Sequence, residues 1–145
     1  MNNNITQLKL ALVFLFLSNG LHAADYKGDW EDNGTGVVRI GDLRVTDNAI
    51  TIINVVSYSI ALDRQEGDVN IYKVRSASIN PDPLGCGPDS KVTYLIIQSL
   101  PDLPLITQKA IRVWFYGRSK QPDMKTIADE PGVCAIYIFG RSSTN

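Results

Sequence analysis

The stretch VSYSIALD, residues 56–63, alternates between apolar side chains and small or polar ones. Its apolar members are Val56, Tyr58, Ile60 and Leu62. Successive side chains of a β-strand point to opposite faces of the sheet, so a period of two predicts a strand with one face in the core and one in water. This stretch therefore assigns the surrounding chain to the β class.

Short alternating or β-branched segments recur along the chain after residue 35. They predict strands at residues 37–40, 43–46, 49–54, 56–63, 68–75, 91–100, 110–116 and 133–141. No window of helical length after the first 23 residues shows an apolar stripe of helical period. Because most connections are short, we expect consecutive antiparallel pairing within a single β domain over residues 24–145. About eight strands avoid exposed edges by closing into an antiparallel up-and-down β-barrel, with a β-sandwich as the alternative.

Residues 1–23 have the organisation of a secretory signal peptide. The apolar run LALVFLFL, residues 10–17, follows Lys9 and precedes the small residue Ala23. This run is far shorter than the roughly 20 residues of a membrane-spanning helix. We therefore expect cleavage after Ala23 or Ala24, and a mature protein that is periplasmic or secreted and not embedded in a membrane.

Two cysteines, Cys86 and Cys134, remain after this cleavage. In an oxidising compartment an even pair in a small domain predicts a disulfide, with two free thiols as the alternative. The bond would tie the Pro- and Gly-rich segment 80–90 to the end of the long connection 117–132. Such a bond either clamps a pair of recognition loops or stiffens one end of a small barrel.

Several classes of chemistry are excluded by composition. Cleavage would remove His22, the only histidine, and with it Ser-His-Asp and Cys-His mechanisms and His-ligated metal sites. Without Lys9, 13 of the 14 basic residues remain against 15 acidic residues, a net charge of −2 that favours no nucleic acid partner. We therefore expect no enzyme activity, no cofactor and no metal.

One dense group of carboxylates remains near the start of the domain, at Asp29, Glu31 and Asp32. Short charged groups usually face water, so a solvated entry turn is the first interpretation. A weak calcium site and a carboxylate-dependent hydrolase are the alternatives, although the spacing does not match an EF-hand loop.

The segment 110–116 has two large faces. Ile111, Val113 and Phe115 share one face, which we expect to lie in the core. Arg112, Trp114 and Tyr116 share the other, followed by Arg118 and Lys120. Trp, Tyr and Arg are favoured anchors at interfaces, so these five residues are candidates for an exposed binding platform. The alternative is a second packed face with Arg112 at its edge.

The two ends of the domain carry a short pattern. Gly28-Asp29-Trp30 stands near the start, and Phe139-Gly140-Arg141 ends the last predicted strand. This pair resembles the lipocalin and wider calycin pattern, in which an Arg from the end of the barrel packs across the ring of a Gly-x-Trp motif. The resemblance implies that Trp30 and Arg141 close one end of the barrel by a cation–π contact. The chain is shorter than a usual lipocalin, so it is more similar to the small calycin-like barrels of bacterial periplasms, which include protease inhibitors.

These observations favour a non-catalytic binding module that recognises a protein partner, such as an enzyme inhibitor or an immunity-type factor. The alternative is a lipocalin-like carrier of a small apolar ligand. The carrier requires an open interior, whereas eight short strands can fill their own barrel with side chains.

Overall fold

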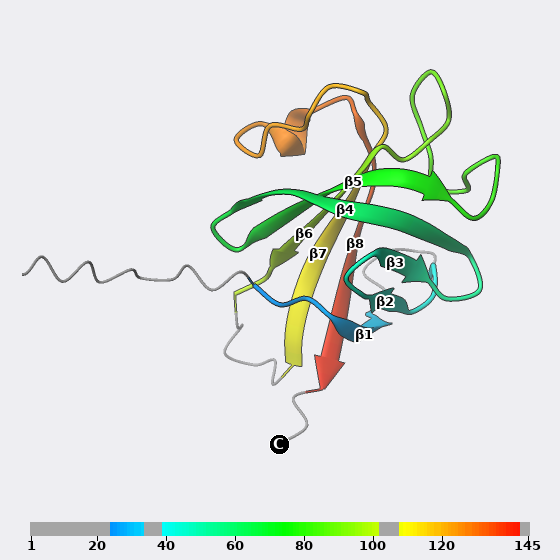
Figure 1. Ribbon diagram of the computed structural model, residues 1–145. Helices are drawn as coiled ribbons and strands as arrows, with labels where there is room; N and C mark the ends of the chain where they lie inside the picture. Colours follow the sequence, from blue (N-terminus) through cyan, green and yellow to red (C-terminus); the bar gives the residue numbers. More distant parts are fainter. Residues whose placement is uncertain (1–23, 34–38, 102–107, 143–145) are drawn as a thin grey trace, which may run out of the picture.

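The computed structural model describes residues 24–33, 39–101 and 108–142. Its eight strands are β1 (Gly28–Asp32), β2 (Leu43–Val45), β3 (Ala49–Ile52), β4 (Val56–Glu66), β5 (Val69–Ala77), β6 (Tyr94–Ser99), β7 (Gln108–Tyr116) and β8 (Val133–Ser142). Each strand pairs antiparallel with its neighbour in the chain, and β1 pairs with β8 to close the barrel (Figure 1). The predicted up-and-down barrel is confirmed, and the sandwich alternative is wrong.

The first strand differs from the prediction. Residues 39 and 40 are not in a strand, and residues 37 and 38 lie outside the described residues. The barrel begins instead with β1, where Trp30 and Asp32 are buried in alternation with exposed neighbours. One oxygen of Asp32 accepts hydrogen bonds from the amides of Ile40 (2.7 Å) and Gly41 (3.2 Å). These bonds hold residues 40 and 41 in a loop where the sequence predicts a strand, because the amides point to a side chain rather than to a neighbouring strand.

The predicted signal peptide, residues 1–23, lies outside the described residues.

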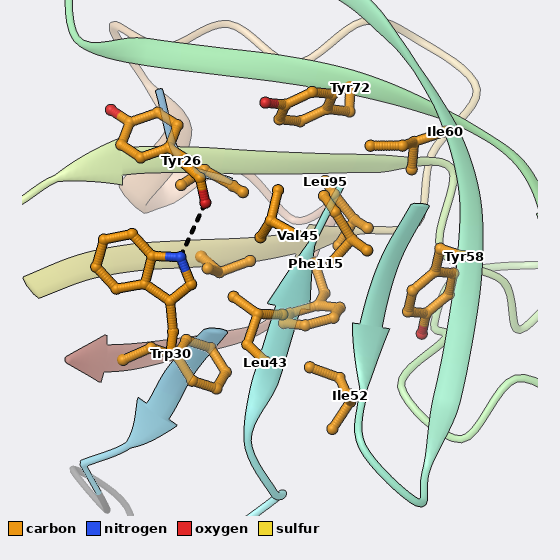
Figure 2. Packing of buried hydrophobic residues seen from close by; sticks show 14 of the residues in the cluster. Tyr26, Trp30, Leu43, Val45, Ile52, Tyr58, Ile60, Tyr72, Leu95 and Phe115 are labelled. Carbon is orange, nitrogen blue, oxygen red and sulfur yellow. Dashed lines mark hydrogen bonds between the residues drawn. The ribbon is translucent and has the colours of Figure 1, made fainter. Parts of the chain in front are cut away.

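The interior of the barrel is filled by side chains from all eight strands. Its largest fully buried members include Tyr58, Phe115 and Phe139. Phe115 contacts Tyr58 at a ring-centroid distance of 6.2 Å and Tyr137 at 5.9 Å, and it lies near the middle of the packed cluster (Figure 2). The predicted core positions Ile111, Val113 and Phe115 are all buried here.

A second cluster covers part of the outside of the barrel. The segment 117–132, called the strap below, contains a short 3-10 helix, η1 (Ile127–Asp129). Ile127 and Met124 of the strap pack on outward-facing side chains of β5, β6 and β7. Those side chains are Val69, Ile71, Tyr94, Ile96, Trp114 and Tyr116. The strap therefore acts as an external cover for one side of the sheet.

The two ends of the domain meet at Trp30. The indole nitrogen of Trp30 donates a 2.9 Å hydrogen bond to the carbonyl of Tyr26 (Figure 2). The guanidinium carbon of Arg141 lies 4.2 Å from the centre of the Trp30 ring, and the same guanidinium donates to the carbonyl of Lys27. The side chain of Arg141, near the end of β8, thus covers Trp30 of β1.

Among the described residues, no helix is long and apolar enough to cross a bilayer.

Candidate functional site

A disulfide between Cys86 and Cys134 is the covalent link at one end of the barrel, where β8 begins; β8 finishes at the opposite end (Figure 1). It joins the loop between β5 and β6, residues 78–93, to the start of β8. Gly117 packs against the bond so closely that a Cβ there would come within 2.9 Å of both sulfur atoms. The predicted disulfide is confirmed, and it fixes the 78–93 loop next to the first residue of the strap.

The 78–93 loop is organised around the buried side chain of Asp82. One carboxylate oxygen accepts hydrogen bonds from the Tyr58 hydroxyl (2.7 Å) and the Leu84 amide (3.0 Å), and the other accepts one from the Val92 amide (3.1 Å). Burial, reinforced by the bond to Asp82, raises the pKa of Tyr58 well above its usual value. This network anchors the loop to the barrel interior.

A surface groove of about 370 Å³ lies where the end of β5 separates from residues 91–93. Val74, Ala77 and Val92 give it an apolar lining, and each of them also packs against the interior cluster. Ile79 stands at the same groove with 47% of its surface exposed. A hollow of this volume lies at the lower end of the range of known binding sites.

Two cations, Arg75 and Lys91, also line the groove, and both residues are exposed. Neither side chain forms an ion pair or hydrogen bond within the part of the chain that the structure describes. Arg44 and Arg64, in contrast, are held by carboxylates at 2.6 Å. The carboxylate of Asp82 is already bonded to a hydroxyl and two amides, so the charges of Arg75 and Lys91 remain available to a ligand.

The expected platform on β7 is covered rather than exposed. Only 4% of the surface of Trp114 and 1% of that of Tyr116 is exposed, because Ile127 of the strap packs on the same cluster. The expectation of an exposed aromatic surface is therefore wrong for these two rings, and the alternative of a second packed face holds. The guanidinium of Arg112 lies over the Trp114 ring at 5.4 Å.

The remaining residues of that predicted set belong to the strap. Arg118 and Lys120 are both exposed. The carbonyl of Arg118 accepts a hydrogen bond from the hydroxyl of Thr93, a residue that lines the groove. The beginning of the strap therefore adjoins the groove, whereas Tyr116 secures its far end by donating a 2.7 Å hydrogen bond to Glu130.

The carboxylates near the first strand do not converge on one point. Asp29 pairs with Arg44 on the surface, and that hydrogen bond holds the pKa of Asp29 below its usual value. Asp32 turns inward to the amides of Ile40 and Gly41, while Glu31 is exposed. No group of three or more metal-binding side chains forms within residues 24–33, 39–101 and 108–142. Asp32 thus shapes the loop after β1.

Two further hollows, of about 390 and 300 Å³, lie near Tyr26. Arg141 stacks on Trp30 and Lys27 pairs with Asp47 at 2.5 Å, whereas Lys109, which lines the larger of the two, has no partner among the described residues. The groove beside the 78–93 loop differs from both, since it combines two cations that have no partner among the described residues, an exposed Ile79 and a wall tied by the disulfide. Comparisons with protein-family models, curated proteins and solved structures find no match for this chain.

The sequence pattern indicates the 80–90 segment but not the residues that flank it. The inward positions of β5 step by two from Tyr72 to Val74 and then by three to Ala77. A slip of this kind in an alternating pattern is the signature of a β-bulge, and it is the sequence signal for an unusual position at Arg75.

Proposed function

We propose that this protein is a non-catalytic binding module of the periplasm or extracellular space that recognises a protein partner at the groove. The supporting observation is a rigid, apolar groove on the outside of a filled barrel, lined by two cations, Arg75 and Lys91, that no described residue pairs with. An apolar centre with charged residues at the rim is the usual anatomy of a protein interface. The fixed 78–93 loop lowers the entropic cost of binding, because the site is ordered before the partner arrives.

The filled interior argues against the carrier alternative. A lipocalin-like carrier needs an internal cup, whereas here the positions that would line a cup, such as Leu43, Tyr58 and Leu95, are buried members of one packed cluster. A role as an enzyme inhibitor or an immunity-type factor fits a rigid external site better. The resemblance of the Trp30–Arg141 pair to the calycin pattern supports the same role, because small calycin-like barrels include protease inhibitors.

Site-specific photo-crosslinking tests this proposal. A photoreactive amino acid replaces Ile79 at the groove and, as the control, Glu31 on the outer face of β1, in the full chain expressed in its own host. We expect the position-79 probe to crosslink one defined protein and the position-31 probe to give none. The proposal also requires that this crosslink disappears in Arg75→Glu/Lys91→Glu and persists in Lys109→Glu/Lys125→Glu, whose lysines are exposed and lie outside the lining of the groove. Crosslinks that are equal at both positions, or unchanged by the groove substitutions, would overturn it.

A further inference from the structure

The edge of β5 is open where it borders the groove. The pairing of β5 with β6 ends at Lys73 opposite Tyr94, followed by one hydrogen bond of 2.9 Å from the Val74 amide to the Thr93 carbonyl. β5 continues to Ala77 and pairs only with β4 over this last part. Within the described residues, the backbone of Arg75–Ala77 therefore has no strand partner on the side of the groove. An unpaired edge of this kind is a template for another strand.

A β-bulge places Arg75 at this edge. Ser59 of β4 lies opposite Ser76, and the next residue, Ile60, lies opposite Val74, which leaves Arg75 as the extra residue. A bulge bends its strand and redirects the side chain of the inserted residue. Arg75 follows the inward-facing Val74 and lines the groove at the surface of the barrel.

The second cation at the groove is fixed by the disulfide-linked loop. The amide of Lys91 donates a 3.3 Å hydrogen bond to the carbonyl of Cys86, and the two residues form an isolated β-bridge. Cys86 is in turn bonded to Cys134. Lys91 is therefore held by a backbone hydrogen bond to a residue that the disulfide fixes.

We propose that the partner contributes a short extended segment that adds a strand to the Arg75–Ala77 edge. An acidic side chain of this segment pairs with Arg75 and Lys91, and a neighbouring apolar side chain occupies the hollow beside Ala77, Ile79 and Val92. In strand addition the backbone hydrogen bonds supply affinity and the side-chain pockets supply specificity. This binding mode rests on the proposed function and goes further, because it specifies the conformation and the chemistry of the bound segment.

Selection from a library of short random peptides tests this binding mode, because it requires no assumption about the identity of the partner. We expect enrichment of peptides in which acidic and apolar residues occur together. Arg75→Glu/Lys91→Glu should weaken their binding by about tenfold, as for charge pairs at an interface, and added salt should weaken binding to the wild type. The control pair Lys109→Glu/Lys125→Glu, two exposed lysines outside the lining of the groove, should leave affinity unchanged. Melting curves of both variants check that the fold is retained.

N-methylation of single peptide amides then tests the backbone contacts. In an added strand alternate amides face the edge, so methylation should abolish binding at alternate positions only. Affinity insensitive to the groove substitutions, or methylation tolerated at every position, would overturn strand addition. Failure to enrich any peptide would also overturn strand addition. If strand addition fails in one of these three ways but the position-79 crosslink persists, the groove binds a folded surface and the proposed function stands. If that crosslink is also absent, both proposals fail.

Discussion

The hydroxyl of Tyr58, inside the barrel, donates a 2.7 Å hydrogen bond to the carboxylate of Asp82, which lies 24 residues further along the chain. Tyr58 contacts Phe115 in the packed interior, and Asp82 lines the groove. This hydrogen bond is a polar link between the core and the candidate binding site, beside the apolar side chains that the two share. The shape of the groove therefore depends on interior packing as well as on the disulfide.

Replacement of Tyr58 by Phe should destabilise the protein. The substitution keeps the ring but removes one donor from a buried carboxylate, a loss that costs about 1–3 kcal/mol. Urea denaturation measures the free energy of unfolding. Tyr137→Phe is the matched control, because the Tyr137 ring also contacts Phe115 and its hydroxyl makes no hydrogen bond within the described residues. An equal loss in both variants would contradict the assigned role of the Tyr58–Asp82 contact.

Stability should fall at alkaline pH. Burial and the hydrogen bond to Asp82 raise the pKa of Tyr58, whereas a tyrosine of the unfolded chain ionises near a pKa of about 10. The stabilisation is thus complete below about pH 10 and is lost as the pH rises above that value. Urea midpoints measured across this range should decline in the wild type and decline less in Tyr58→Phe. Burial also raises the pKa of Tyr116, to about 12, so part of the decline should remain in that variant. Identical pH profiles for the two proteins would refute this assignment.

Loss of the disulfide should lower the melting temperature. The bond closes a loop across a sequence separation of 48, for which the chain-entropy model gives about 4 kcal/mol at most. We expect a reductant to lower the melting temperature of the wild type and to leave Cys86→Ala/Cys134→Ala unchanged. Hydrogen exchange at the Lys91 amide should also accelerate in the double variant more than exchange within β7. A wild type that is insensitive to reductant would show that the bond contributes nothing.

Replacement of Arg141 by Ala should weaken the closure of the barrel. The guanidinium stacks on Trp30 and bonds to the carbonyl of Lys27, and a cation–π contact of this kind contributes about 0.5–2 kcal/mol. Arg44→Ala is the control, since its surface pair with Asp29 is expected to contribute little. Thermal denaturation should show the larger loss for Arg141→Ala. The reverse order would remove the structural role that the calycin resemblance implies for the Trp30–Arg141 pair.

Much of the fold can be predicted from local sequence pattern. The alternation of residues 56–63 predicts β4, and short connections predict antiparallel neighbours. The compartment suggested by residues 1–23 predicts the Cys86–Cys134 bond, because pairing of cysteines depends on redox conditions more than on neighbouring residues.

The candidate site is harder to predict, because alternation identifies two faces of a strand but not what covers each of them. Alternation places Trp114 and Tyr116 on the face opposite Phe115, as the structure has them, yet the strap buries both. The strap shows no periodic pattern, and its cover depends on the isolated apolar residues Met124 and Ile127. The groove depends on a bulge and on a buried carboxylate, which arise from contacts between segments distant in sequence.

The position-79 crosslink identifies the partner. Amide hydrogen exchange of the wild-type protein, measured alone and in its non-covalent complex with that partner, tests the central claim most directly. If the partner is recognised at the groove, protection should increase in residues 74–79 and 91–93 and stay unchanged at the far end of the strap, residues 124–130. Protection confined to the strap, or to the Trp30 end of the barrel, would contradict recognition at the groove.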